Sequence, residues 1–138
     1  LIYTDGESYL MDEVLYATQM SNQELSKILR EYAVPVIADS AEPKSIDEIH
    51  KYGVNIHPCK KGADSVRSGI NYMKGKKLFI TSRSVNGIKE LRNYKYHEDK
   101  NGKMTNQPVD AFNHFIDASR YAITWRQTRP NYGTYAIG

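Results

Sequence analysis

The sequence has one cysteine and no long apolar run, and both shortages exclude whole classes of protein. A single thiol, Cys59, cannot form an internal disulfide framework and is typical of a reducing compartment. No run approaches the roughly 18 apolar residues that a membrane span needs. The first residues lack the basic region and apolar stretch of a secretion signal, and they lack an initiator Met. We therefore expect an excised fragment with no membrane segment and no secretion signal.

Two catalytic signatures are also missing. A glycine-rich phosphate loop of the Walker type does not occur, which disfavours an ATPase activity within this chain. No G-x-S-x-G elbow occurs, which disfavours a Ser-His-Asp hydrolase. The net charge of +3 and the pI near 8.9 permit a polyanionic partner but do not require one.

The composition is that of one globular domain. Hydrophobic residues make up 40% and charged residues 25% of the 138 residues, which is enough chain to bury a single core. No internal repeat divides the sequence. We therefore expect residues 1–138 to form one domain with one site.

The opening residues predict a β-hairpin. Leu1 and Tyr3 are followed by the turn signal Asp5-Gly6, and strand-forming residues follow, including the run 14–16. Two antiparallel strands are expected from this pattern.

Strand and helix patterns alternate after the hairpin. Ser21 and Glu24 form a capping box, in which each side chain satisfies a free backbone amide at a helix start. The predicted helices are Asn22–Tyr32, Pro43–Gly53, a helix that carries Val66, Ile70 and Met73 and ends at Gly75, a helix that begins at Ser82 or Ser84 and continues through Leu91, and Val109–Trp125. The predicted strands are Val34–Ala38, Val54–His57, Lys77–Ile80 and the edge strand Tyr94–Tyr96.

This order of elements predicts an α/β fold. A hairpin followed by strand-helix units indicates a mixed sheet with antiparallel first strands, parallel later strands and helices on both faces. Two fold families fit, a doubly wound nucleotide-type sheet and the RNase H-like sheet. The opening hairpin favours the RNase H-like fold.

Asp39 follows the apolar strand Val34–Ala38, which is expected to be buried on both faces. Open α/β sheets bind ligands in the crevice at the carboxyl ends of their strands, so a carboxylate here is exposed and rigidly held. The alternative is that Asp39 or Ser40 caps the next helix, and position alone does not decide between these roles.

The final helix carries a polar stripe. Asp110, His114 and Asp117 follow at spacings of four and three residues and therefore project from one face. Hard divalent ions prefer oxygen ligands, and with Asp39 this face would form a two-metal site that hydrolyses a phosphodiester. The alternative is a solvated face with Asp110 favourably placed in the first turn. The adjacent face, suited to packing, carries Phe115, Ala118, Ala122 and Trp125.

Basic residues cluster in the middle third of the chain, on predicted loops and helix ends. Such side chains bind DNA phosphates and give affinity without sequence information, although scattered lysines also serve solubility. The candidates for DNA binding are Lys60, Lys61, Arg67, Lys76, Lys77 and Arg83.

Three stretches carry a resemblance to a known family: Ile37–Ile46 (IADSAEPKSI), Lys61–Ile70 (KGADSVRSGI) and Pro108–Ala122 (PVDAFNHFIDASRYA). Together they resemble the nuclease domain of the terminase large subunits of tailed phages and prophages, and the similarity covers nearly the whole chain. The resemblance implies an RNase H-like fold, a pair of Mg2+ or Mn2+ ions, and endonucleolytic cutting of concatemeric double-stranded DNA during genome packaging in the host bacterial cytoplasm.

The resemblance also implies roles for single residues. Asp39 is then a metal-binding acid at the end of a central strand, and the final helix supplies the remaining ligand or ligands from among His114, Asp117 and Asp110. Glu42 is expected to cap or orient its loop. The implied partners are double-stranded DNA and, in the full-length motor, the portal protein and the small terminase subunit.

One part of the family pattern is not found. The family's nuclease domain opens with a strand that carries an Asp in a pattern like G-x-D-x-G, and Asp5 is no substitute because it occupies the hairpin turn. We therefore expect that this strand and the ATPase domain are absent and that the chain alone cleaves DNA weakly or not at all. The alternatives are a non-catalytic RNase H-like module that docks to DNA or the portal, a Holliday-junction resolvase-like nuclease, and a ligand-binding doubly wound domain.

Overall fold

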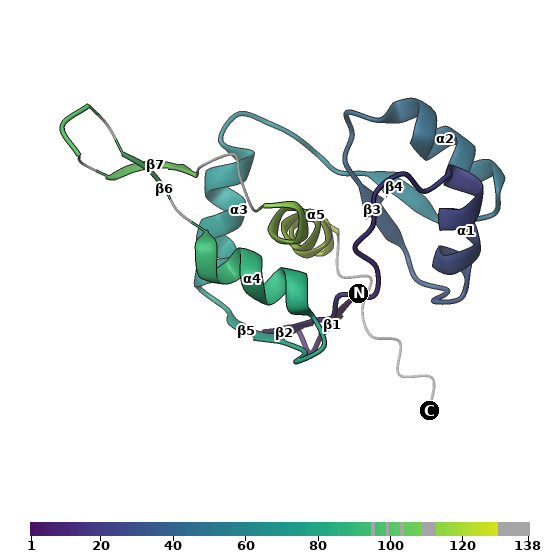
Figure 1. Cartoon of the computed structure of the whole chain (residues 1–138), viewed down its shortest axis with the longest axis horizontal. Coiled ribbons are helices and arrows are strands. Elements are labelled where there is room, and N and C mark those ends of the chain that lie inside the picture. The colour runs from purple at the N-terminus through teal and green to yellow at the C-terminus, as the bar shows by residue number, and fades with distance from the viewer. Residues whose placement is uncertain (95, 99, 103, 109–112, 130–138) are drawn as a thin grey trace.

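The computed structural model describes residues 1–94, 96–98, 100–102, 104–108 and 113–129. The strands are β1 (Ile2–Thr4), β2 (Ser8–Met11), β3 (Val36–Ala38), β4 (Ile56–Pro58), β5 (Lys77–Ile80), β6 (Tyr96–Glu98) and β7 (Met104–Pro108). The helices are α1 (Asn22–Arg30), α2 (Pro43–Lys51), α3 (Ser65–Lys74), α4 (Val85–Asn93) and α5 (His114–Thr128). Figure 1 shows α5 in the middle, with α3, α4 and β5 on one side of it and α1, α2, β3 and β4 on the other.

The strands pair as a mixed α/β fold predicts. β1 is antiparallel to β2, β2 is parallel to β5, and β3 is parallel to β4, while β6 and β7 form a separate antiparallel hairpin. The predicted fold class is therefore confirmed. The single sheet expected from the sequence is divided, because β1 and β3 are both edge strands and no strand in the described ranges lies between them.

The opening hairpin turns at Asp5 and Gly6, as predicted. Gly6 adopts a φ of +97°, which favours glycine, and Asp5 Oδ1 accepts hydrogen bonds from the amides of Glu7 and Ser8 at 2.9 and 2.7 Å. These amides lower the pKa of Asp5 to about 2. The second strand ends at Met11, so the run 14–16 lies outside it.

Local signals placed most helices well. Ser21 Oγ accepts from the Glu24 amide at 3.1 Å and Glu24 Oε2 accepts from the Ser21 amide at 3.0 Å, so the capping box is confirmed, and α1 ends at Arg30 rather than at Tyr32. Helix α3 ends at Gly75 as predicted. Ser84 stands at the start of α4, but its hydroxyl accepts from the Glu13 amide at 2.8 Å instead of capping the helix.

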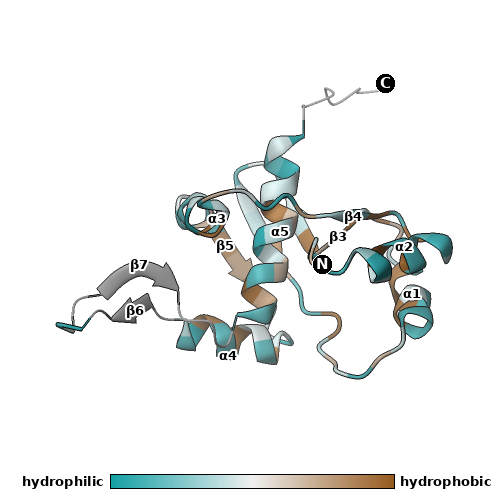
Figure 2. Cartoon of the chain, turned by 90° about the horizontal axis from the view of Figure 1, so that it is seen from above, coloured by the Kyte–Doolittle hydropathy of each residue, from teal (hydrophilic) through white to brown (hydrophobic). Residues whose placement is uncertain are grey.

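The buried apolar residues form two clusters rather than the single core expected from chain length. One contains Tyr9, Met11, Met73 and Ile123. The other contains Ile49, Val54 and Ile56. Figure 2 shows hydrophobic residues along β5 and along β3 and β4, on the two sides of α5. The clusters are separate because the sheet is divided between β1 and β3.

Carboxylates from other elements satisfy the first turns of α5 and α4. Glu90 of α4 is 2% exposed and accepts hydrogen bonds from the amides of Phe115 and Ile116 at 2.7 and 3.1 Å. It therefore satisfies free amides in the first turn of α5 from another element. Glu13, just after β2, does the same for α4 by accepting from the Gly87 amide at 2.7 Å. The position of α5 therefore depends on β2 and α4.

Helix α5 is the longest described helix, with 15 residues. No helix within the ranges that the structure describes is both long and apolar enough to cross a membrane.

Candidate active site

Asp39 directly follows β3, where the sequence placed it. Its Oδ1 accepts from the Ala41 amide at 2.8 Å and lies 2.5 Å from Nζ of Lys61, which comes from the loop between β4 and α3. The Lys61 ammonium, followed by the Ala41 amide, lowers the pKa of Asp39, and Asp39 in turn raises the pKa of Lys61. Asp39 is therefore ionised at neutral pH.

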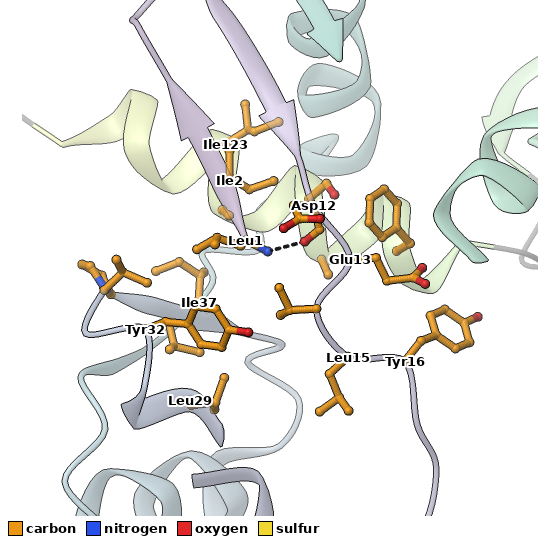
Figure 3. A pocket seen from close by; sticks show the side chains of 18 of the residues that line it. Leu1, Ile2, Asp12, Glu13, Leu15, Tyr16, Leu29, Tyr32, Ile37 and Ile123 are labelled. Carbon is orange, nitrogen blue, oxygen red and sulfur yellow. Dashed lines mark hydrogen bonds between the residues drawn. The ribbon is translucent and has the colours of Figure 1, made fainter. Parts of the chain in front are cut away.

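Strand β3 is half-buried rather than buried on both faces, which corrects the interpretation of its apolar run. The physical reason is a cavity of about 830 Å³ that borders it. Figure 3 shows this cavity with Ile2 of β1, Ile37 of β3 and Ile123 of α5 around it.

Tyr121 of α5 joins the two parts of the site. Its hydroxyl lies 3.4 Å from Asp39 Oδ2, and Asp117 precedes it by one helical turn. Burial first, and then the negative charges of Asp117 and Asp39, raise the pKa of Tyr121. Tyr121 therefore contacts Asp39 directly and lies one helical turn after Asp117 on α5.

Asp117 is held by a buried arginine that the sequence analysis missed. Arg120 is 5% exposed, and its Nη2 donates to Asp117 Oδ1 at 3.0 Å. Its guanidinium carbon lies 4.7 Å from the ring centre of Tyr121, within cation-π range. Its Nε is buried and finds no hydrogen-bond acceptor in the part of the chain that the structure describes. The spacing of three residues from Asp117 was the only sequence signal for this pair.

Gly69 of α3 makes room for this arginine. A Cβ at Gly69 would lie 2.8 Å from both Cγ and Cδ of Arg120. Gly69 belongs to one of the three motifs that carried the resemblance, and its close approach gives that glycine a physical role.

The other predicted site residues have different outcomes. His114 is the first residue of α5, is exposed and borders the cavity. Asp110 lies outside the described residues and stays a prediction. Glu42 stands at the N-cap of α2 but makes no side-chain capping hydrogen bond.

The predicted packing face of α5 needs correction. The buried residues of this helix are Ile116, Ser119, Arg120 and Ile123. Phe115 of the predicted face does pack, against the first cluster and beside Gly87. Ala118 is exposed, and Ala118, Ala122 and Trp125 border the cavity, so only this part of the prediction is wrong.

The predicted DNA-binding residues lie on α3 and the segments on either side of it. Half of the six are ion-paired: Lys61 with Asp39, Arg67 with Asp64, and Arg83 with Asp12. Lys76 lies over the ring of Tyr72, 5.2 Å from its centre. Lys60 and Lys77 are exposed.

The donor set fits a hard divalent cation in part. Asp39 and Asp117 provide carboxylate oxygens, and Mg2+ is commonly bound by one or two carboxylates together with waters and substrate phosphates. Among the residues that the structure describes, however, no group of three or more His, Cys, Asp or Glu side chains is arranged to hold a metal ion. The chemistry of the ligands fits, and their number is incomplete.

A hairpin-opened mixed sheet, with an acid after a parallel strand and a second acid on the last helix, defines an RNase H-like class of domain. The family model described as the terminase RNase H-like domain matches residues 2–124, and the chain belongs to this family. The resemblance drawn from the three motifs is thereby confirmed.

Two curated relatives are terminase large subunits. That of Bacillus phage SPP1 is 41% identical over 92 residues, which cover 64% of this chain and 22% of that protein. The PBSX phage terminase large subunit of Bacillus subtilis strain 168 is 31% identical over 112 residues, which cover 78% of this chain and 26% of that protein. The chain therefore spans about a quarter of the length of these relatives.

Two solved structures share the fold. The nuclease domain of the g2p large terminase from bacteriophage SPP1, with bound Mn, has a TM-score of 0.83 and 30% identity, over 91% of this chain and 76% of that one. The large terminase of a thermophilic bacteriophage has a TM-score of 0.68 and 17% identity, over 90% of this chain and 35% of that one, which is a likeness of fold alone. The RNase H-like fold, rather than the doubly wound alternative, is confirmed.

Proposed function

We propose that this nuclease domain is an endonuclease that hydrolyses phosphodiester bonds of double-stranded DNA with divalent metal ions bound at Asp39 and Asp117. The observation that carries the proposal is the position of Tyr121, whose hydroxyl contacts Asp39 just after β3 and which follows Asp117 by one turn on α5. The SPP1 nuclease domain, which was solved with bound Mn, supports the choice of metal.

Each side chain has a distinct role in this proposal. Mg2+ or Mn2+ ions bound here would supply an activated water and stabilise the leaving oxygen of an in-line displacement. Arg120 occupies Asp117 Oδ1 and thereby leaves Oδ2 for a cation. His114, one turn before Asp117, is kept as a candidate to complete the ligand set or to orient a water. Asp110 is kept as a further candidate ligand.

The proposed substrate is the concatemeric DNA of a phage or prophage, cut during packaging in the host bacterial cytoplasm. The exposed lysines Lys60 and Lys77, together with Lys76, would contact backbone phosphates. In the full-length motor the portal protein and the small terminase subunit are the proposed partners, because the matched relatives are terminase large subunits.

We further propose that an additional strand between β1 and β3 completes the site. Both strands are hydrogen-bonded to a neighbour on one side only within the described sheets, and an apolar cavity lies between them. A segment parallel to β3 and antiparallel to β1 would join the two sheets and cover the open face of α5. We propose that an extended segment of the longer protein fills this position. It would carry one further carboxylate near Asp39 and so bring the number of ligands to that of a metal site.

Cleavage of supercoiled plasmid in Mn2+ tests the proposal. We expect little or no nicking by the 138-residue chain and clear nicking by a longer protein that includes the completing strand. Asp39→Asn should abolish nicking in the longer protein. Asp47→Asn is the matched control, because Asp47 is also paired with a lysine, Lys51 at 2.8 Å, but lies on α2. Equal nicking by the Asp39 and control variants would contradict the assignment.

The second candidate function is a non-catalytic DNA-docking module. It is favoured by the incomplete ligand group in the described residues. A longer protein that binds duplex DNA but does not nick it in Mn2+ or Mg2+ would establish this alternative.

A further inference from the structure

The two acids of the proposed metal site are paired with cationic side chains that differ in burial. Asp117 is paired with Arg120, whose side chain is 6% exposed. Asp39 is paired with Lys61, whose side chain is 43% exposed and comes from a loop. The buried guanidinium cannot leave without reorganising α3 and α5, whereas the ammonium needs only side-chain rotation to reach solvent.

The Lys61 ammonium lies where a divalent cation would bind. Its Nζ is 2.5 Å from Asp39 Oδ1, while Oδ2 faces the Tyr121 hydroxyl at 3.4 Å. Nζ is also 5.8 Å from the centre of the Tyr121 ring, whose face attracts cations. The same Oδ1 also accepts from the Ala41 amide, so Lys61 and this amide together cover one of the two carboxylate oxygens.

Electrostatics makes the two cations competitors. A divalent ion and an ammonium that share one carboxylate oxygen would lie within a few ångströms of each other and repel strongly in a partly buried site. Binding of a metal through Oδ1 of Asp39 therefore requires Lys61 to move.

We propose that Lys61 is an exchangeable counter-ion of Asp39, which holds the carboxylate in place until a divalent ion binds and is then displaced toward the phosphate of bound DNA. This inference rests on the proposed metal site at Asp39. It assigns Lys61 a role in metal binding that differs from simple phosphate binding. Lys61 first competes with the metal for Asp39 and then contacts a phosphate of the bound DNA.

The alternative, in which Lys61 and Asp39 form a permanent structural ion pair, leads to the opposite prediction. If Lys61 only anchored the loop between β4 and α3, its removal would loosen Asp39 and weaken metal binding or leave it unchanged. Exchange predicts that removal of Lys61 strengthens metal binding, because the metal no longer has to displace a cation.

Calorimetric titration with Mn2+ at low ionic strength separates these roles. Exposed ion pairs contribute about 0.4–1 kcal/mol when the geometry is good, so we expect Lys61→Met to bind Mn2+ about two- to fivefold more tightly than the wild type. Lys51→Met is the matched control, because it removes the same charge from an exposed pair with Asp47. The control should bind Mn2+ with the wild-type affinity.

The outcomes distinguish this inference from the function on which it rests. Unchanged or weaker binding by Lys61→Met, with binding lost in Asp39→Asn, would overturn the exchange and leave the metal site intact. Equal tightening in both lysine variants would also overturn it, since a general charge effect would then suffice. Binding that survives in Asp39→Asn would remove the metal site and the exchange together.

Duplex binding provides a readout independent of metal affinity. With the 138-residue chain, the salt dependence of duplex affinity should lose about one unit of slope in Lys61→Met when Mg2+ is present, and stay unchanged without Mg2+. A slope change that is the same with and without Mg2+ would show that Lys61 is free to bind phosphate at all times, which contradicts the exchange.

Discussion

Replacement of Glu90 tests how the site helix is held. Glu90→Ala removes the acceptor of the Phe115 and Ile116 amides at the start of α5, and it also removes the acceptor of the Tyr16 hydroxyl at 2.9 Å. The side chain is almost fully buried, so water does not replace it at the two amides. Loss of a helix cap costs about 1 kcal/mol, and each buried donor left without an acceptor costs about 1–3 kcal/mol.

We expect Glu90→Ala to lower the free energy of unfolding by about 2–4 kcal/mol, because the cost of burying the carboxyl group itself is recovered in part. For a domain of this size such a loss lowers Tm by about 8–15 °C. Glu90→Gln keeps one oxygen acceptor and should lose about half as much. Glu31→Ala, at the exposed end of α1, should change the free energy by less than about 0.5 kcal/mol.

Urea and thermal unfolding of the three variants measure these differences. A loss below about 1 kcal/mol in Glu90→Ala would refute the reasoning, because the two amides would then have found other acceptors or water.

Two further predictions concern the surroundings of the site. Gly69→Ala should lower the free energy of unfolding by about 1–3 kcal/mol and weaken Mn2+ binding, because the added Cβ displaces Arg120 from Asp117. Destabilisation with unchanged Mn2+ affinity would contradict the role given to Arg120. Hydrogen bonds from Arg83 and Thr81 lower the pKa of Asp12 to about 2, so Asp12 stabilises the fold above its unfolded pKa of about 3.9 and this contribution is lost as the pH falls toward 2. Asp12→Asn should make the free energy of unfolding depend less on pH in that range. A variant with the wild-type pH dependence would contradict this prediction.

Features that depend on neighbouring residues were predictable from the sequence. The Asp5-Gly6 turn, the Ser21 and Glu24 capping box and β5 all appear where local patterns placed them, because each rests on the backbone geometry or hydrogen bonding of a few adjacent residues. The position of Asp39 after β3 was predictable for the same reason.

Features that depend on tertiary contacts were not predictable. Helical spacing shows which residues share a face of α5, but it does not show that Ala118 is exposed beside a cavity while Ile116 and Ile123 are buried. The pairing of Asp39 with Lys61, 22 positions apart, likewise depends on how the loop after β4 returns to β3. Arg120 was missed because buried arginines are rare and its burial comes from the packing of α3 on α5.

The most direct test of the account is Mn2+ calorimetry of the longer protein that includes the completing strand, with Asp39→Ala, Asp117→Ala and the control Asp47→Ala. The account predicts that the wild type and the control bind Mn2+ and that both site variants lose binding, because their carboxylates contribute to one metal site. Equal binding in all four proteins, or in none of them, would contradict the claim that Asp39 and Asp117 form a metal site between β3 and α5.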